Sequence, residues 1–565
     1  MAIIGINMSG FHSSAALIDK GKIKAAITEE RLTRIKRDKS FPKNSIEYCL
    51  KVANISQKQI TDIFIGWNPI FYLKKSDNTL FDSLKDRGKL AYLALNELSI
   101  LNDENIISIK EQIKTVNSCW DIHFVNHHYA HLSNVFFLSG FDDSDFFMAD
   151  GFGEHTTGCT GDINFENIRN FSDFRSPHSL GSFYSTFTQF LGFQPNGDEW
   201  KLMALASLGN PDKYYGKVKN LIRVDDLNFE LDLSYFEHFL YFTEKKYSSK
   251  LISTFGNPVK KHEELKQDHY DIVASVQKVA EDVSMEILNN LYKRTKNKNI
   301  VVSGGFFMNS VLNGKILENT PYENIFIGGS PDDSGVSIGS ALYGWNFIKK
   351  NRLPAKSLNH NYFGQEFSNI EIIEELEKRK IDYEVVEKPE SLAAKKLRDK
   401  KVVAWFQGRS EFGQRALGNR SILADPTFED IKDVINSSIK YRESFRPFAP
   451  SVLEEKQNNY FLIPKNQKSY FMEKVFLFKE EFRNKLPGVV HYDGSGRLQT
   501  VKKTLNPKYY RLIQEYEKLS GFGIVLNTSF NINGMPLVET PSDAIDCFYQ
   551  SGIDILFMNN VVVMK

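Results

Sequence analysis

Short apolar runs separated by polar turns open the chain and recur through its first 350 residues. Runs of this kind, bounded by turn-forming residues, indicate buried strands. The predicted strands are 2–7, 14–18, 23–28, 122–125, 146–149, 300–302 and 325–327. Helices are predicted at 45–52, 80–97, 270–292 and 335–347, with a further one running through Asn309 and Leu312; in 270–292 the apolar residues recur at helical spacing. This alternation of strands and helices is typical of an α/β domain.

The chain becomes polar and irregular at 350–363 (KNRLPAKSLNHNYF), which indicates an interdomain linker. Beyond it, the pattern predicts strands at 402–406 and 523–526, helices at 429–436 and 509–519, and a closing strand, as in an α+β domain. With 565 residues the chain is too long for one hydrophobic core. We therefore expect a first domain over 1–350, a linker over 351–365 and a second domain over 366–565.

Composition narrows the class of protein. Lys plus Arg is 71 and Asp plus Glu is 70, so the basic excess typical of nucleic-acid binders is absent. The four cysteines are scattered without a C-x-x-C pair, which fits a reducing cytosol better than a disulfide or zinc framework. The first residues lack a signal-peptide layout, and no run of about 18 apolar residues occurs. We expect a cytoplasmic protein, monomeric or homodimeric, without a nucleic-acid or membrane partner.

A histidine pair is the sharpest local feature of the first part. His127 and His131 are four residues apart, so on a helix both imidazoles reach one cation. The H-E-x-x-H pattern of metalloproteases fails, because His128 stands where the glutamate is needed. His128 points off the shared face and is expected to be structural. Taken alone, the pair fits a metal site and two packed histidines equally.

Further polar residues follow predicted strands. Asp150 ends one strand, and Asp332 and Asp333 precede a helix, where capping is the commoner role for a carboxylate. Gly304 and Gly305 lie between a strand and a helix, as in a phosphate-binding loop, although many ordinary turns use glycine. A lone histidine, His12, lies in the first turn, and Glu199 and Lys201 fit either a surface turn or a nucleotide contact.

The second domain concentrates cations in two segments. Residues 408–421 (GRSEFGQRALGNRS) hold three Arg among three Gly, and residues 440–448 (KYRESFRPF) add three cations among aromatics. Arginine forks bind phosphate and carboxylate through paired hydrogen bonds, and the chain as a whole is neutral. Anion binding is therefore favoured over a solvated basic face. Residues 526–531 (LNTSFN) and 491–497 (HYDGSGR) could supply further donors or form ordinary surface turns.

In this order, the motifs resemble those of the O-carbamoyltransferases, which include the nodulation-factor, cephamycin and tobramycin carbamoyltransferases. The resemblance covers nearly the whole chain, and its most specific segments are GRSEFGQRALGNRSILADP, KYRESFRPFAP and LNTSFNINGMPLVETPSDAI. It implies an N-terminal duplicated α/β domain of the actin-like (TsaD-like) fold. It also implies a C-terminal α+β domain that resembles YrdC.

The resemblance implies a two-step reaction. Carbamoyl phosphate and ATP would form carbamoyl adenylate in the second domain, and the first domain would pass the carbamoyl group to a hydroxyl of a small-molecule acceptor, a natural product or a sugar. By position, the implied metal ligands are His127, His131, Asp150 and Asp333, the last because it directly precedes Ser334-Gly335. His12 matches the catalytic histidine, which would accept the proton of the attacking alcohol.

Two further sets of residues follow from the resemblance. The nucleotide in the N-terminal domain is expected to meet Glu199, Lys201, Gly304, Gly305 and Asn309. The carbamoyl phosphate and ATP site of the C-terminal domain is expected to include Arg415, Arg420, Lys440, Arg442, Arg446, His491, Asn527 and Ser529. Two positions depart from the family pattern: Ser13 replaces the Asp that follows the histidine, and Gln414 replaces the Pro before Arg-Ala-Leu-Gly.

The implied cofactors are ATP with Mg²⁺, carbamoyl phosphate as donor, and a divalent metal. Two His and two Asp suit Fe(II), which we favour, as well as Mn(II) or Zn(II). Two other functions remain open at this point. A tRNA threonylcarbamoyl-type enzyme would need a basic RNA-binding face, and an actin-fold sugar kinase would leave the Arg-rich second domain without a role.

Overall fold

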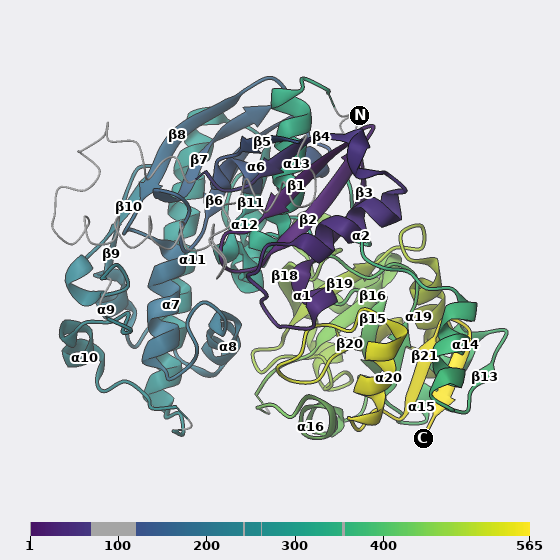
Figure 1. Cartoon of the computed structure of the whole chain (residues 1–565). Coiled ribbons are helices and arrows are strands. Elements are labelled where there is room, and N and C mark those ends of the chain that lie inside the picture. The colour runs from purple at the N-terminus through teal and green to yellow at the C-terminus, as the bar shows by residue number, and fades with distance from the viewer. Residues whose placement is uncertain (1, 69–119, 241–242, 262, 353–355, 444) are drawn as a thin grey trace. The chain divides into compact units, whose positions relative to one another are not determined.

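The computed structural model describes residues 2–68, 120–240, 243–261, 263–352, 356–443 and 445–565 (Figure 1). Within it the chain forms two compact units. The first consists of Met1–Lys24 and Lys39–Ser357, and the second of Ala25–Asp38 and Leu358–Lys565. The segment Ala25–Asp38 thus belongs to the second unit although the rest of that unit follows more than 300 residues later.

Two five-stranded sheets of the same topology carry the first unit, except that the last residues of one edge strand, from Ala25 on, are assigned to the second unit. Their orders are β3-β2-β1-β4-β5 and β8-β7-β6-β11-β12. In each, the central strand pairs antiparallel with the next strand in sequence and parallel with a later one. The strands are β1 (Ala2–Asn7), β2 (Ser14–Asp19), β3 (Lys22–Thr28), β4 (Ile60–Ile65), β5 (Asp121–Phe124), β6 (Asp143–Ala149), β7 (Thr156–Asn164), β8 (Ile168–Arg175), β11 (Asn299–Ser303) and β12 (Asn324–Phe326). This repeated topology confirms the predicted duplicated, actin-like α/β fold.

Helices α6 (His127–Ser139) and α13 (Val336–Tyr343) pack against each other, and α13 also packs on the sheet of β1 while α6 packs on the sheet of β6. Their close approach needs a glycine, because a Cβ at Gly339 would lie 1.8 Å from the Ala130 carbonyl oxygen. The remaining elements are α2 (Lys43–Ala53), α7 (Leu180–Phe190), α8 (Glu199–Leu205), α9 (Tyr215–Lys219), α10 (Ser249–Phe255), α11 (Gln267–Thr295), α12 (Ser310–Asn319), β9 (Ile222–Asp225) and β10 (Asn228–Leu231). No helix among the described residues is long and apolar enough to span a membrane.

A ten-stranded mixed sheet forms the second unit, in the order β13-β22-β21-β14-β15-β20-β16-β19-β18-β17. Alternate residues of β14 point to opposite faces, so Ala404 enters one hydrophobic cluster and Trp405 the other. Its strands are β13 (Glu384–Val385), β14 (Val403–Phe406), β15 (Arg420–Ala424), β16 (Ala449–Leu453), β17 (Phe461–Leu462), β18 (Lys474–Phe478), β19 (Ser495–Val501), β20 (Ile524–Ser529), β21 (Ile555–Met558) and β22 (Val561–Met564). Its helices are α1 (Glu29–Thr33), α14 (Asn369–Lys378), α15 (Pro389–Arg398), α16 (Ile431–Ile435), α17 (Gln457–Tyr460), α18 (Glu480–Arg483), α19 (Pro507–Ser520) and α20 (Pro541–Tyr549).

The element boundaries differ from the predicted ones in a few places. The predicted helix at 335–347 is α13, which passes into a π-helical turn at Gly344–Ile348. The predicted helix at 429–436 begins at Ile431 and likewise ends in a π-helical turn, Asn436–Lys440. The predicted helix at 80–97 lies outside the described residues.

Asp145 of β6 makes the stability of the first unit depend on pH. Its side chain is buried, and its Oδ2 accepts hydrogen bonds from Thr295 Oγ1 and the Tyr322 hydroxyl, both at 2.6 Å. Burial, opposed by these two bonds, raises the pKa of Asp145 from 3.8 to about 6. The folded protein therefore binds the extra proton between these two values, so stability falls as pH rises through that window.

We expect Asp145→Asn to remove this dependence. When melting temperatures are measured from roughly pH 4 to pH 7, the variant should become progressively more stable than wild type as pH rises. The reason is that wild type alone loses on the order of 3 kcal/mol of stability over this window. A constant offset from altered hydrogen bonds would not change the slope. A difference in melting temperature that stays the same across the window would contradict the assignment.

Candidate functional site

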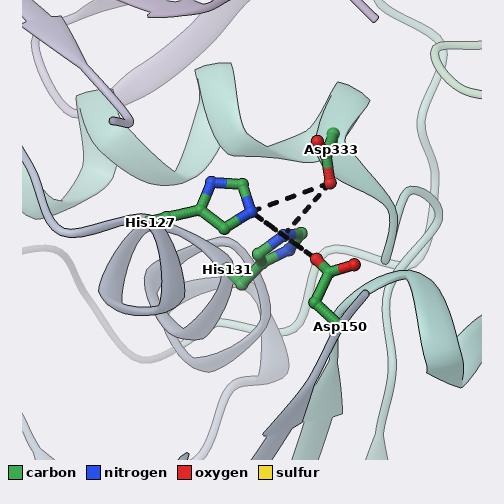
Figure 2. Close-up of side chains that lie close together, drawn as sticks. All are labelled: His127, His131, Asp150 and Asp333. Atoms are coloured by element: carbon green, nitrogen blue, oxygen red, sulfur yellow. Dashed lines mark hydrogen bonds and ion pairs between the residues drawn. The ribbon is translucent and has the colours of Figure 1, made fainter. Parts of the chain in front are cut away.

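Four side chains of the first unit converge on one buried point (Figure 2). His127 and His131 lie one turn apart on α6, Asp150 follows β6, and Asp333 opens the 3-10 turn ahead of α13. The two imidazole Nε2 atoms are 3.2 Å apart. The Oδ2 atom of Asp150 lies 3.5 Å from His127 Nε2 and 3.0 Å from His131 Nε2. The Oδ1 atom of Asp333 lies 3.7 Å and 3.6 Å from the same two nitrogens.

Residues outside the cluster orient three of its four members. The Nδ1 atom of His127 is 3.1 Å from the Gly66 carbonyl oxygen, and His131 Nδ1 is 3.5 Å from Ser303 Oγ. Both rings thus hold their second nitrogen to a fixed partner and present Nε2 to the carboxylates. Ser9 Oγ donates to Asp333 Oδ2 at 2.5 Å, which leaves Oδ1 facing the histidines. Sequence reasoning did not identify Ser9, since an isolated serine in a turn carries no signal.

The start of α6 is fixed by a second buried acid. Asn126 caps the helix by accepting from Tyr129 N at 3.0 Å. The Glu154 carboxylate accepts from the main-chain nitrogens of His127 and Asn68, both at 2.9 Å. Negative charge at a helix N-terminus is favourable, even though burial raises the pKa of Glu154. The sequence showed Glu154 only as the last residue of a Gly-rich loop, so its role in placing the histidines was missed.

Electrostatics couple the four side chains tightly. Burial lowers the pKa of His131, but hydrogen bonds with Asp150 and Asp333 outweigh it and raise the pKa to about 9. Burial opposes ionisation of Asp150, yet the two histidines hold the pKa of its carboxyl far below the usual range. His128 behaves differently: burial and the charge of His127 lower its pKa well below normal, and its Nδ1 shares a hydrogen bond of 2.9 Å with Thr156.

The donor set fits a divalent transition metal. The four ligand atoms lie within 4.8 Å of one another, and all four residues are buried. Asp150 Oδ2 is buried and lies close to both imidazoles, but it forms no hydrogen bond of normal geometry with them or with any other described residue. This oxygen is therefore available to a bound cation. Two imidazole nitrogens and two carboxylate oxygens suit Fe(II), Mn(II) or Zn(II), because no thiolate selects a softer ion.

The predicted glycine loop lies against the same cluster. Gly304, at φ +99°, approaches β6 so closely that a Cβ would lie 2.1 Å from the Ala149 carbonyl oxygen. A Cβ at Gly305 would lie 3.0 Å from Asp150 Oδ1. The close approach of this turn to Asp150 therefore requires Gly304, and it leaves main chain rather than side chains beside that carboxylate.

The other predicted residues of the first unit lie in three places. His12 lies in the β1–β2 turn, which also carries Ser9, and its carbonyl oxygen accepts from Asn7 Nδ2. Glu199 and Lys201 lie at the start of α8 with partners in their own region: Glu199 accepts from Ser185 and the Asn196 main chain, and Lys201 pairs with Asp198. Asn309 caps α12 and exchanges hydrogen bonds with Gln277 of α11.

In the second unit, cations gather near the end of the 436–440 turn. Asn436 organises them: its Oδ1 accepts from Arg442 Nε at 2.6 Å, and its Nδ2 donates to the Arg446 carbonyl oxygen at 3.4 Å. Burial and the charge of Arg446 lower the pKa of Arg442 to about 9. Burial and then the charges of Arg415, Arg442 and Arg446 lower the pKa of Arg497 well below its usual range. We call Arg415, Arg442, Arg446 and Arg497 the arginine cluster.

Lys440 and His491 lie beside the arginine cluster. Burial, together with the charges of Arg442 and Arg446, lowers the pKa of Lys440 well below its usual value. Lys440 Nζ donates to Ser529 Oγ at 3.3 Å and to Asn531 Oδ1 at 2.9 Å. Burial and the charge of Arg497 lower the pKa of His491 to about 4, so its ring is neutral at neutral pH. Its buried Nε2 has no hydrogen-bond partner among the described residues.

Arg420 and Asn527 contact the main chain. The Arg420 guanidinium is fully buried, lies 3.6 Å from the centroid of the Phe406 ring and donates to carbonyl oxygens, including those of Gln407 and Gln365. Asn527 Nδ2 donates to the Ala416 carbonyl oxygen at 3.2 Å. Both side chains therefore support the 407–419 loop, which carries Arg415. Arg497 itself was not predicted, although the segment 491–497 had been noted as polar.

Comparison with known proteins covers both parts of the chain. The family described as carbamoyltransferase N-terminus matches residues 2–342, and that described as carbamoyltransferase C-terminus matches residues 394–565. An uncharacterized protein of Synechocystis is 36% identical over 100% of this chain and 96% of its own length. Nodulation protein NolNO of Sinorhizobium fredii is 32% identical over 98% of this chain and 78% of its own. An uncharacterized protein of Methanocaldococcus jannaschii is 33% identical over 100% of this chain and 99% of its own.

These matches confirm the predicted family. One family description spans more than half of the chain, and the relatives are similar over nearly its whole length. The buried histidine and aspartate cluster and the arginine cluster lie within the two matched regions. The chain therefore belongs to the carbamoyltransferase family and is a carbamoyltransferase.

Proposed function

We propose that this carbamoyltransferase is an ATP-dependent O-carbamoyltransferase acting on a small-molecule acceptor. In the first step, carbamoyl phosphate, water and ATP give carbamoyl adenylate, phosphate and pyrophosphate in the second unit. In the second step, an acceptor hydroxyl oxygen attacks the carbamoyl carbon in the first unit. The bond from that carbon to the adenylate oxygen breaks, AMP leaves, and the hydroxyl proton passes to a base.

The arginine cluster is the observation that carries the proposal. Bringing four half-buried arginines and the buried Lys440 close together is costly unless anions bind between them, and the lowered pKa values of Lys440, Arg442 and Arg497 express that cost. Arg442 Nη2 and Arg497 Nε are buried without hydrogen-bond partners among the described residues. Carbamoyl phosphate and ATP are polyanions that would satisfy these donors with charge-assisted hydrogen bonds.

Three roles are proposed within the second unit's site. Arg415, Arg442 and Arg446 would bind the phosphoryl oxygens and stabilise the charge that develops as pyrophosphate departs. Lys440 would hold Ser529 and Asn531 toward the same anions. Neutral His491, with its buried Nε2 free, would donate to or accept from the carbamoyl group.

In the first unit, the base proposed for transfer is His12. A neutral imidazole there would accept the hydroxyl proton while the acceptor oxygen attacks. His127, His131, Asp150 and Asp333 would hold a divalent metal, Fe(II) by preference, which would polarise the carbamoyl carbonyl when bound. Gly304 and Gly305 would let the adenylate approach the cluster through the main chain, with Glu199, Lys201 and Asn309 lining the remainder of the nucleotide site.

Pyrophosphate release tests the first step. Purified protein supplied with Mg²⁺-ATP is expected to release pyrophosphate only when carbamoyl phosphate is added, in the absence of any acceptor. A coupled phosphatase assay, with AMP and ADP followed by chromatography, distinguishes the outcomes. ADP formed on addition of a sugar, without pyrophosphate, would refute the proposal and favour a kinase.

A further inference from the structure

The segment Ala25–Asp38 forms part of the second unit, and two of its three arginines, Arg31 and Arg34, contact residues late in the chain. Arg31, on α1, is 4% exposed and forms an ion pair with the fully buried Glu539 at 3.3 Å. Arg34, at the end of the same helix, donates to the carbonyl oxygens of Leu537 and Pro536 at 2.7 and 3.1 Å. Both arginines therefore contact the segment 536–539, and Arg31 also reaches the loop that contains Glu411 and Gly413.

Arg31 holds the loop that leads into Arg415. Its Nη2 donates to the carbonyl oxygen of Gly413 at 2.9 Å and to that of Glu411 at 3.3 Å. Gly413 is two residues before Arg415 and adopts φ +98°, a left-handed conformation open to glycine. A guanidinium can reach two carbonyl oxygens and a carboxylate at once because its donors form a rigid planar fork.

The same loop is also held after Arg415. Asn527 Nδ2 donates to the Ala416 carbonyl oxygen at 3.2 Å, and Gln499 Nε2 donates to that of Leu417 at 2.8 Å. The Glu411 carboxylate accepts from the main-chain nitrogens of Leu417 and Asn419 at 2.7 and 2.8 Å. Arg415 is thus flanked on both sides by residues whose carbonyl groups are fixed, and on the N-terminal side Arg31 supplies these contacts.

We propose that Arg31 is a positioning residue for the anion site, which fixes the main chain at Gly413 so that Arg415 projects into the arginine cluster. The inference rests on the proposed function, since the anions are taken to be carbamoyl phosphate and ATP. The segment Ala25–Asp38, although far in sequence from the C-terminal motifs, would then contribute to anion binding in the unit proposed to form the adenylate. A role in folding alone would lower stability without changing how tightly the anions bind.

Two matched lysine variants test it in the full-length protein. Arg31→Lys keeps a positive charge for Glu539 but loses the fork that reaches both carbonyl oxygens. Arg34→Lys makes the same change on the same helix, away from the 411–415 loop. Pyrophosphate release gives KM for carbamoyl phosphate and kcat, calorimetric titration with inorganic pyrophosphate gives anion binding, and thermal unfolding gives stability.

For Arg31→Lys we expect KM for carbamoyl phosphate to rise about tenfold, with kcat within about threefold of wild type. Arg34→Lys should keep the wild-type KM, while its melting temperature should be similar to that of Arg31→Lys. An unchanged KM in Arg31→Lys, or an equal rise in both variants, would overturn the inference. If Arg31→Lys does not fold, the double variant Arg31→Met with Glu539→Gln, which leaves no unpaired buried charge, replaces it under the same criteria.

Failure of the proposed function gives a different pattern. In that case even the wild-type protein releases no carbamoyl-phosphate-dependent pyrophosphate, and the titration with inorganic pyrophosphate decides the inference. Binding weakened about tenfold in Arg31→Lys, but not in Arg34→Lys, supports the positioning role. Equal binding by all three proteins overturns it.

Discussion

Asp333→Asn is expected to abolish carbamoyl transfer to the acceptor, whereas Asp332→Asn, one residue away, should leave transfer within about twofold of wild type. The two carboxylates point to different partners. Asp333 Oδ1 lies within 3.7 Å of both cluster imidazoles, while Asp332 Oδ1 accepts from Ser334 Oγ at 2.6 Å. An amide at position 333 replaces an anionic ligand by a neutral one, which weakens binding of a hard or borderline divalent ion.

Metal binding and the first reaction step provide the controls for this pair. Titration calorimetry with Mn²⁺ should show affinity reduced by at least about 100-fold in Asp333→Asn and unchanged in Asp332→Asn. Pyrophosphate release should stay near wild type in both, because the adenylate is proposed to form in the second unit. Full carbamoyl transfer by Asp333→Asn, or equal loss of metal in the two variants, would contradict the assignment of Asp333 as a ligand.

Elements with large apolar side chains could be predicted from sequence. All six residues of β1 (AIIGIN) are buried, and four of the five residues of β11 are buried, so both strands appear in the sequence as continuous apolar runs.

The hairpin β7–β8 was not predicted. β7 (TTGCTGDIN) is almost entirely buried, but two of its positions must be glycine: a Cβ would lie 2.2 Å from Met148 O at Gly158 and 2.0 Å from Arg169 O at Gly161. Neighbouring strands approach β7 so closely that small residues are needed there, and the sequence of β7 therefore lacks the run of large apolar residues that predicts a buried strand.

The candidate metal ligands could be proposed because their local sequences are specific. Spacing alone suggested that His127 and His131 share a helix face, and the resemblance supplied Asp150 and Asp333. The structure brings all four together within 4.8 Å. Their roles stay predictions until metal binding is measured.

The supporting residues could not be foreseen, because each acts across a long sequence separation. Glu154 fixes the main chain of His127, and Arg31 contacts a loop some 380 residues later. Neither lies in a motif. Arg420 illustrates the converse, since its segment predicts anion binding while its guanidinium is enclosed by carbonyl oxygens and the Phe406 ring. Residue type and spacing suggest chemistry, but the direction of a side chain depends on packing contributed by distant segments.

The two units should be separable by single substitutions. Arg446→Ala is expected to reduce carbamoyl-phosphate-dependent pyrophosphate release by at least about 100-fold, because it removes one of the guanidinium groups proposed to bind the departing phosphates. His12→Asn is expected to leave pyrophosphate release unchanged and to slow transfer to the acceptor by about 100- to 10,000-fold, the usual contribution of a general base. Arg379→Ala, which removes an arginine paired with Glu375 and Asp546 on the second unit, is the matched control for Arg446→Ala.

Each step is measured separately to compare the variants. Pyrophosphate release without acceptor reports the first step. Transfer of carbamoyl from carbamoyl phosphate, followed by mass spectrometry of a hydroxylated acceptor identified by screening natural products and sugars, reports both steps together. His12→Asn should accumulate or hydrolyse adenylate without transferring it, since its main-chain carbonyl can still accept from Asn7 Nδ2 and the turn is retained. If His12→Asn lost pyrophosphate release and transfer equally while its melting temperature stayed unchanged, His12 would not act in the transfer step alone. That result would contradict the proposal that the two steps occur in different units.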